Sequence, residues 1–345
     1  MSSRRRRLIN YLVIGLITIV FLWFFFKSVN WAETWKYIKK VNPYLMALTL
    51  CLVPLHLVTR SIRWKYLLRP VKAGLKIYNA IEANTLGYTV NYIFPGRLGE
   101  VVRPVFLARK EKLSAGYLIG TIVVERTFDI FAMCFLLGAF LISKPAYGSF
   151  YQTRPEALTH LYFWGKVGLV LAILLFMLIV LIYSLKGKAS QLVSSLSRPF
   201  PEKIRWRVVS FGQEFIEGLK FFQSWPRLIG YFCLSLVVWL GICFFYWVFL
   251  LAYEVKVPFF LTIPYVFLTG VGASIPTPGM AGGFDYFSRV GLTSLFGLEA
   301  NLAVGLTIVV HAIQLIVTCA LGYVIIWANR LSLFQVRELG KGSKR

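Results

Sequence analysis

Apolar residues fill long stretches of this chain, and each stretch has about the length that a helix needs to cross a lipid bilayer. Of the 345 residues, 58% are hydrophobic and 17% are aromatic. A spanning helix needs roughly 20 consecutive apolar residues, and only helices and closed barrels satisfy their backbone hydrogen bonds within lipid. The sequence therefore predicts an all-α, polytopic integral membrane protein. About six stretches are long enough for full spans, at about 8–26, 44–60, 115–143, 161–185, 228–252 and 301–327.

Two Pro-Gly breaks with the same spelling interrupt two further apolar stretches, about 77–94 and about 259–297. The first break reads I-F-P-G-R-L-G and the second P-T-P-G-M-A-G, so both contain P-G-x-x-G. Proline disrupts a helix, and glycine permits backbone angles that other residues resist. A matched pair of breaks in two halves of a membrane chain indicates a transport site. We predict two re-entrant hairpins, shaped by Pro95, Gly96, Gly99, Pro278, Gly279 and Gly282.

Basic residues flank the apolar blocks, and the formal net charge is +24. This distribution indicates orientation by the positive-inside rule and attraction to anionic headgroups, so we expect no nucleic-acid partner. Both flanks of 77–94 are basic, as a segment that enters the membrane and turns back requires. The charges place both termini on the cytoplasmic side of an inner (plasma) membrane. The loop 27–43 opposes this trend with Lys27, Lys36, Lys39 and Lys40.

The order of spans and hairpins predicts one transmembrane domain over 1–345, built as a repeat. Each half of the chain is predicted to contain two spans, one hairpin and a third span, in that order. The halves are residues 8–143 and 161–327. Three crossings per half would invert the second half relative to the first. The loop 186–227 contains apolar residues at helical spacing between 204 and 222. That helix would lie on the inner membrane surface or pack against the protein.

Several short motifs that would indicate a metal site, a disulfide or a catalytic site are absent from the sequence. The five cysteines lie in apolar stretches without a C-x-x-C, and no histidines have ligand spacing, so we expect no disulfide, metal or cofactor. No nucleophile elbow or phosphate-binding loop occurs. Arg4 to Arg7 followed by an apolar run resembles an export leader, but that run is long and no clear cleavage site follows. We expect a retained first span, with a twin-arginine signal as the alternative.

Charged side chains at membrane depth are the candidate site residues, because they are costly there unless they serve a function. Glu125 and Asp129 are four residues apart on one helix face, with Arg126 beside them. These three residues could bind substrate or carry a proton. Alternatively, they form an internal ion-pair network with Arg97 or Arg103.

The two breaks carry further candidates. Arg97, Glu100 and Arg103 follow the first break, and arginine forms fork-shaped contacts with phosphate. Asp285 and Arg289 follow the second break. Alternatively, the charges after the first break lie at the cytoplasmic edge of the membrane. The pair after the second break would then be a solvent-exposed pair on one helix. Four other polar residues are expected mainly to form hydrogen bonds within the protein: Glu82, His56, His311 and Gln314.

Three motifs together resemble a known family: N-Y-I-F-P-G-R-L-G-E-V-V-R-P at 91–104, V-E-R-T-F-D at 124–129 and P-T-P-G-M-A-G-G-F-D at 276–285. The chain resembles, over about 8–330, the flippase-like transmembrane domain of lysylphosphatidylglycerol synthases. The resemblance implies an inner-membrane protein linked to translocation of phospholipids or lipid-linked precursors. It also implies that the charged and glycine positions of these motifs shape the pathway. The soluble aminoacyl-transferase domain of full synthases has no counterpart in these 345 residues.

We therefore expect membrane translocation of an anionic phospholipid or a lipid-linked precursor between leaflets, with membrane lipids as the partners. A membrane transferase acting on a polyprenyl-phosphate sugar or a lipid headgroup is the alternative, with Glu125 or Asp129 as the base. A third hypothesis is a structural partner of a lipid-synthesis enzyme.

Overall fold

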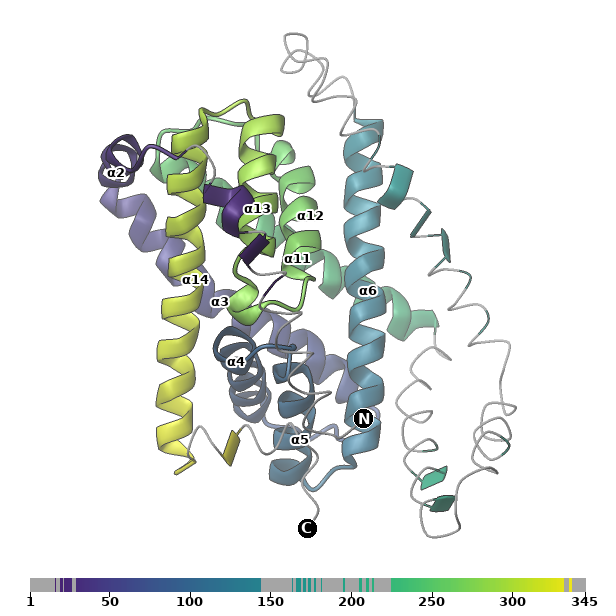
Figure 1. The fold of residues 1–345 in the computed structure, drawn as a ribbon. Coiled ribbons are helices and arrows are strands. Elements are labelled where there is room, and N and C mark those ends of the chain that lie inside the picture. The colour runs from purple at the N-terminus through teal and green to yellow at the C-terminus, as the bar shows by residue number, and fades with distance from the viewer. Residues whose placement is uncertain are drawn as a thin grey trace.

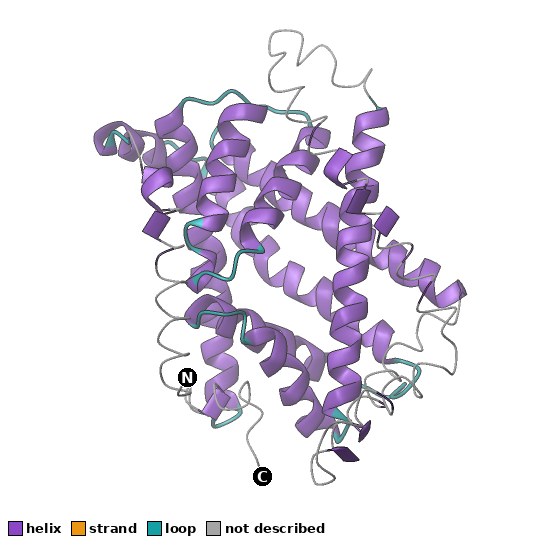
Figure 2. Ribbon diagram, turned by 45° about the vertical axis from the view of Figure 1, so that its right-hand side comes forward, coloured by secondary structure: helices purple, strands orange, loops and turns teal. Residues whose placement is uncertain are grey.

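A computed structural model describes residues 29–143 and 225–331, together with isolated positions within 16–26, 163–213 and 335–336. The predicted spans at 8–26 and 161–185 lie largely outside the described residues, as does the predicted amphipathic helix within 186–227. Every regular element in the described part of the chain is helical (Figure 2). The prediction of an all-α protein is therefore confirmed.

Three described helices are long and apolar enough to cross a membrane: α3 (Pro43–Leu68), α11 (Trp225–Ala252) and α14 (Ala300–Ala328). Helix α6 (Ala115–Ile142) has 28 residues, or roughly 42 Å at the usual rise of a helix. It differs from the other three because Glu125, Arg126 and Asp129 interrupt its apolar sequence.

Helix α3 extends beyond the predicted span. The sequence predicts a span over about 44–60 followed by a basic surface stretch, but the helix continues to Leu68. Arg60 and Arg63 are buried, with 7% and 0% of their surface exposed. The prediction was wrong for these two arginines because their acidic partners lie on α6, far away in the sequence.

The segment before α3 also contains a helix where the sequence predicts a loop. Helix α2 (Trp31–Lys39) begins after Asn30, whose side chain accepts hydrogen bonds from the first turn. Asn42 caps α3 in the same way. Such caps stabilise a helix by about 1 kcal/mol. Asn301 of α14 donates to Glu33 at 2.6 Å and ties α2 to that helix.

The first break separates α4 (Ile77–Ile93) from α5 (Gly99–Glu111), and the two helices run antiparallel. Asn79 and Lys72 bind the carboxylate of Glu111 at the base of this hairpin. Burial of the Glu111 carboxyl opposes ionisation, but these hydrogen bonds outweigh it and lower the pKa below its ordinary value. Glu82 binds Lys110 and Asn329, which confirms it as a hydrogen-bonding group inside the protein.

Glycines let the two helices of each hairpin touch. A Cβ atom on Gly99 would lie 1.8 Å from the carbonyl oxygen of Gly87 in α4. The second hairpin consists of α12 (Thr262–Ala273) and α13 (Gly283–Val290), preceded by the short helix η2 (Phe259–Leu261) and continued by η4 (Gly291–Leu295). A Cβ atom on Gly272 would lie 2.5 Å from the carbonyl oxygen of Gly283. Both hairpins therefore depend on close backbone contact.

The P-G-x-x-G breaks share a backbone geometry. In the first, Gly96 and Arg97 have φ values of +83° and +53°; in the second, Gly279 and Met280 have +60° and +62°. Each proline is thus followed by two left-handed residues, a conformation that glycine tolerates best. The second break includes the short helix η3 (Pro278–Met280). The two breaks therefore share a local backbone conformation, and the inverted repeat stays a prediction.

The hairpins point toward each other from opposite ends of the helical bundle, between α14 and α6 (Figure 1). Helices α4 and α5 fill the lower half of that view, and α12 and α13 fill the upper half. The two apolar cores follow the same division, with one around Trp64, Leu86 and Phe128 and the other around Phe249, Tyr265 and Leu306. The breaks meet between these cores.

Candidate functional site

A network of buried arginines and carboxylates joins α3, α5 and α6. Arg103 forms a two-pronged contact with Glu125, at 3.1 Å from Nη1 to Oε1 and 2.5 Å from Nη2 to Oε2. Arg63 lies 3.4 Å from Glu125 and 2.6 Å from Asp129. The alternative of an internal ion-pair network is therefore confirmed for Arg103. Fork-shaped contacts of this kind are strong and fix the relative orientation of two helices.

Arg63 lies at the centre of this network, although the sequence places it in a basic stretch with no predicted role at the site. Its Nη1 atom also contacts Ser235 of α11 at 3.2 Å, and its guanidinium lies over the ring of Tyr231. One signal could have identified it: Arg60 and Arg63 are three residues apart and continue the helical face of an apolar span.

Arg126 and Arg60 complete the cluster on the side of Asp129. Arg126 lies 3.4 Å from Asp129 and 3.8 Å from Glu100, and Arg60 lies 4.0 Å from Asp129. The indole of Trp239 donates to Asp129 at 3.1 Å. Glu100 also pairs with Arg97 at 3.3 Å. The cluster thus contains five arginines (Arg60, Arg63, Arg97, Arg103, Arg126) and three carboxylates (Glu100, Glu125, Asp129), a formal surplus of two positive charges.

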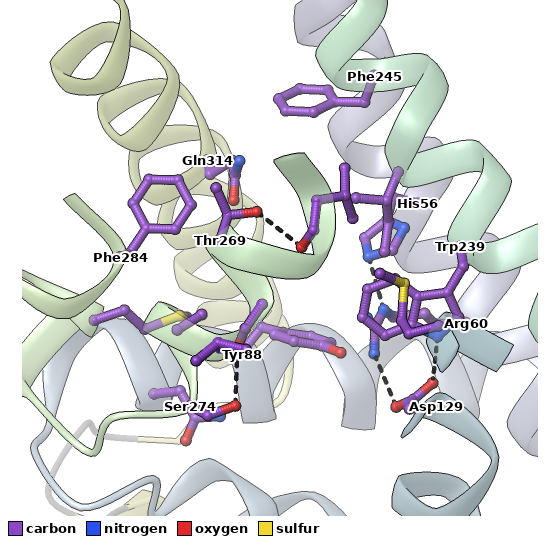
Figure 3. Close-up of a pocket in the computed structure, with 18 of the residues that line it drawn as sticks. His56, Arg60, Tyr88, Asp129, Trp239, Phe245, Thr269, Ser274, Phe284 and Gln314 are labelled. Atoms are coloured by element: carbon purple, nitrogen blue, oxygen red, sulfur yellow. Dashed lines mark hydrogen bonds and ion pairs between the residues drawn. The ribbon is translucent and has the colours of Figure 1, made fainter. Parts of the chain in front are cut away.

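A cavity of about 530 Å³ opens beside this cluster, between the two hairpins. Figure 3 shows His56, Arg60 and Asp129 along one wall, and Thr269 and Ser274 of the second hairpin across from them. Arg97, Glu100 and Arg126 also line it. The remaining wall is mainly apolar, with Leu52, Val53, Ile242, Phe245, Val266 and Phe267. The cavity is therefore amphipathic, with charge concentrated near α6 and the first break.

Several polar atoms around the cavity have no hydrogen-bond partner among the described residues. They are Arg60 Nη1, Tyr88 Oη, Arg126 Nε, Asp129 Oδ2 and Thr277 Oγ1. Buried polar atoms are normally paired. Arg60 Nη1, Arg126 Nε and Asp129 Oδ2 form only longer ion-pair contacts of 3.4–4.0 Å. Arginine donors without a hydrogen bond, next to surplus positive charge, are suited to binding an anion.

The tip of the first hairpin contacts the second through Arg97. This residue donates to the carbonyl oxygen of Ala273, at the end of α12, and pairs with Glu100 at 3.3 Å. A Cβ atom on Gly279 would lie 3.2 Å from the carbonyl oxygen of Tyr92. The two tips thus meet at two points along the cavity wall.

The structure places Asp285 and Arg289 away from the arginine cluster. Asp285 accepts from the backbone of Gly282 at 2.8 Å and contacts His311 at 2.6 Å. Arg289 donates to the carbonyl oxygens of Phe24 and Phe25. Neither residue lines the cavity. Of the eight predicted site residues, Arg97, Glu100, Arg126 and Asp129 line the cavity, and Arg103 and Glu125 lie directly behind it.

The expected hydrogen-bonding residues also have defined partners. His56 accepts from Arg60 at 2.7 Å. Gln314 bridges the hydroxyls of Tyr92 and Tyr246. Among the described residues, no group of three metal-binding side chains occurs.

Comparisons with known proteins identify the family of this chain. Residues 9–322 match the model of the lysylphosphatidylglycerol synthase TM region. A UPF0104 membrane protein of Methanocaldococcus jannaschii is 23% identical over 304 residues, covering 84% of this chain and 86% of that protein. A second UPF0104 membrane protein of that organism is 35% identical over 86 residues, which cover 25% of this chain and 35% of that protein. No solved structure matches. The chain is thus a membrane protein that belongs to the family of the lysylphosphatidylglycerol synthase transmembrane region.

Proposed function

We propose that this protein moves an anionic phospholipid or a lipid-linked precursor between the leaflets of a membrane. The observation that carries this proposal is the amphipathic cavity between two broken hairpins, beside a cluster with two surplus positive charges. Its volume of about 530 Å³ lies within the range of small-molecule sites, roughly 300–1,000 Å³. A headgroup phosphate would supply the missing negative charge, while the acyl chains remain in lipid.

Arg126 is the residue that we assign to the phosphate. Its side chain is 37% exposed and lines the cavity, whereas Arg63 and Arg103 are 0% and 5% exposed. All three arginines contact Glu125, but Arg63 and Arg103 do so at 3.4 and 2.5 Å and are buried, so we assign these two to the internal network. Arg97 remains tied to Ala273 and Glu100 at the tip, and we assign it to the contact between the hairpins.

The transferase alternative has less support from this geometry. Both oxygens of Glu125 contact arginines, so neither is available to accept a proton from a substrate. Asp129 accepts from Arg63 and Trp239 through one oxygen and lies near Arg60 and Arg126 through the other. The hypothesis of a lipid-synthesis partner depends on the 204–222 segment, which lies largely outside the described residues.

Replacement of Arg126 tests the assignment. We expect Arg126→Gln to slow leaflet exchange of a fluorescent phosphatidylglycerol roughly tenfold to hundredfold, since a hydrogen bond to a charged group contributes about 1.5–3 kcal/mol. The measurement is reduction of the outer-leaflet fluorophore by dithionite in liposomes with equal amounts of protein.

Arg109→Gln is the matched control, because Arg109 is an exposed arginine in the last turn of α5 and does not line the cavity. It should exchange lipid at the wild-type rate. Equal rates for Arg126→Gln and wild type would refute the site, and no exchange by the wild type of phosphatidylglycerol or a polyprenyl phosphate would refute the function. An inner (plasma) membrane location with both termini cytoplasmic belongs to the same proposal and is testable by terminal tags in intact cells.

A further inference from the structure

The second break is held by a pair of titratable side chains that the proposed lipid site does not use. His311 of α14 contacts two groups: its Nδ1 atom lies 2.6 Å from Asp285 Oδ1, and its Nε2 atom lies 2.8 Å from the carbonyl oxygen of Gly279. The two side chains are only 14% and 7% exposed. The same carboxylate accepts from the backbone of Gly282. This pair therefore connects α14 to both ends of the break.

Proton counting shows that these contacts require one proton beyond a neutral histidine and an ionised aspartate. A carbonyl oxygen can only accept, so Nε2 of His311 must carry a hydrogen. In a neutral imidazole, Nδ1 then presents a lone pair to Asp285 at 2.6 Å. That contact is favourable only when a proton lies between the two atoms, on either one. Without this proton, one ring nitrogen of His311 carries a lone pair. That lone pair then faces an oxygen atom of either Asp285 or Gly279, which is unfavourable.

We propose that Asp285 and His311 bind one proton at the second break, and that loss of this proton releases the contact of Gly279 with Tyr92, one of the two contacts between the hairpin tips. Gly279, which His311 holds, packs against the backbone of Tyr92 in the first hairpin. Deprotonation breaks the contact of His311 with either Gly279 or Asp285. In the second case the tip also loosens, because Asp285 caps the break through Gly282.

The surroundings of the pair are polar but carry little competing charge. The ring of Tyr92 in α4 lies 6.4 Å from that of His311, and Phe284 of α13 lies 4.9 Å from it. Gln314 lies one turn along α14 and is bonded to Tyr246 of α11. Arg289 lies one turn along α13 and donates to backbone carbonyls. The proton comes from the aqueous phase and returns to it.

The first test measures lipid exchange, so it rests on the proposed function. Two variants are expected to have opposite effects on the exchange rate. In Asp285→Asn, the amide can donate to Nδ1 of a neutral His311 and still accept from Gly282, so the closed tip needs no extra proton. In His311→Ala, the carbonyl oxygen of Gly279 has lost its contact with His311, so the tip of the second hairpin is released at every pH. We expect wild-type exchange of fluorescent phosphatidylglycerol to rise about tenfold as pH increases. Asp285→Asn should remain at the slow rate and His311→Ala at the fast rate.

A spectroscopic measurement tests the proton site without lipid transport. The chain has three histidines, so the ¹⁵N resonances of His311 can be assigned by their absence from His311→Ala. In the wild type they should shift with pH, and in Asp285→Asn they should not. Invariant wild-type resonances, or a full pH response of exchange in Asp285→Asn, would overturn the proton site.

The two proposals fail in different ways. Arg126→Gln should slow exchange at low and high pH alike and leave the ratio of the two rates unchanged. If the wild type exchanges lipid without any pH dependence, the release of the tip by proton loss is wrong and the lipid function stands. If it exchanges no lipid while the His311 resonances titrate as expected, the lipid function is wrong and the proton site stands.

Discussion

Glu125→Gln is expected to destabilise the protein by about 3–5 kcal/mol, because removal of one partner from a buried ion pair leaves uncompensated charge. Glu125 is 1% exposed and pairs with Arg103 and Arg63 at once. A neutral amide would leave these two guanidinium groups with a net deficit of one negative charge. The measurement is the midpoint of thermal unfolding in detergent, which should fall by roughly 10 °C.

Glu100→Gln is the matched control for this stability measurement. Glu100 also pairs with two arginines, Arg97 and Arg126, but its side chain is 30% exposed and its contacts are 3.3 and 3.8 Å. Solvent screens such pairs, so the expected loss is about 1 kcal/mol or less. Similar losses for the two variants would show that the stability of the network does not depend on burial.

Gly99→Ala should disrupt the first hairpin and lower stability by about 3 kcal/mol or more, comparable to the larger effects of overpacking. The new methyl group would overlap the carbonyl oxygen of Gly87 and lie 2.6 Å from Oδ1 of Asn91. Neither can move easily, since Gly87 is backbone within α4 and Asn91 accepts from the amide of Gly99 at 2.8 Å. We expect reduced yield and a lower unfolding midpoint.

Gly138→Ala separates this clash from the general effect of adding a methyl group. Gly138 lies in α6, and a Cβ atom there would meet no other atom within 4 Å. Alanine favours helix over glycine by about 1 kcal/mol, so the control should match or exceed the wild type. A destabilised Gly138→Ala together with a tolerated Gly99→Ala would contradict the packing described for the hairpins.

Local chemistry explains which parts of the site were predictable. The pairs Pro95-Gly96 and Pro278-Gly279 combine a residue that disrupts helices with one that permits left-handed angles, so the two breaks could be located from the chain alone. Proline without a following glycine is not enough, since Pro54 and Pro104 lie inside helices α3 and α5. Glu125 and Asp129 stood out because carboxylates are rare in an apolar helix. The interpretation of Arg60 and Arg63 failed for the same local reason: they follow an apolar run, where surface arginines are common.

Asp285 and Arg289 illustrate the opposite limit. Their spacing suggested an ion pair on one face of a helix, yet Asp285 binds His311 and Arg289 binds backbone carbonyls. Spacing within a helix defines which side chains of that helix can contact each other. It does not determine which groups from other helices pack against them.

The sequence by itself determined the membrane class, the helical architecture and the two breaks, because hydropathy and the backbone properties of proline and glycine act over a few residues. Only the tertiary structure decided that Arg63, Arg103, Glu125 and Asp129 form one network. It also decided that the hairpin tips meet beside an amphipathic cavity and that His311 holds one of them. These contacts join residues far apart in the chain, and their partners are selected by the packing of whole helices.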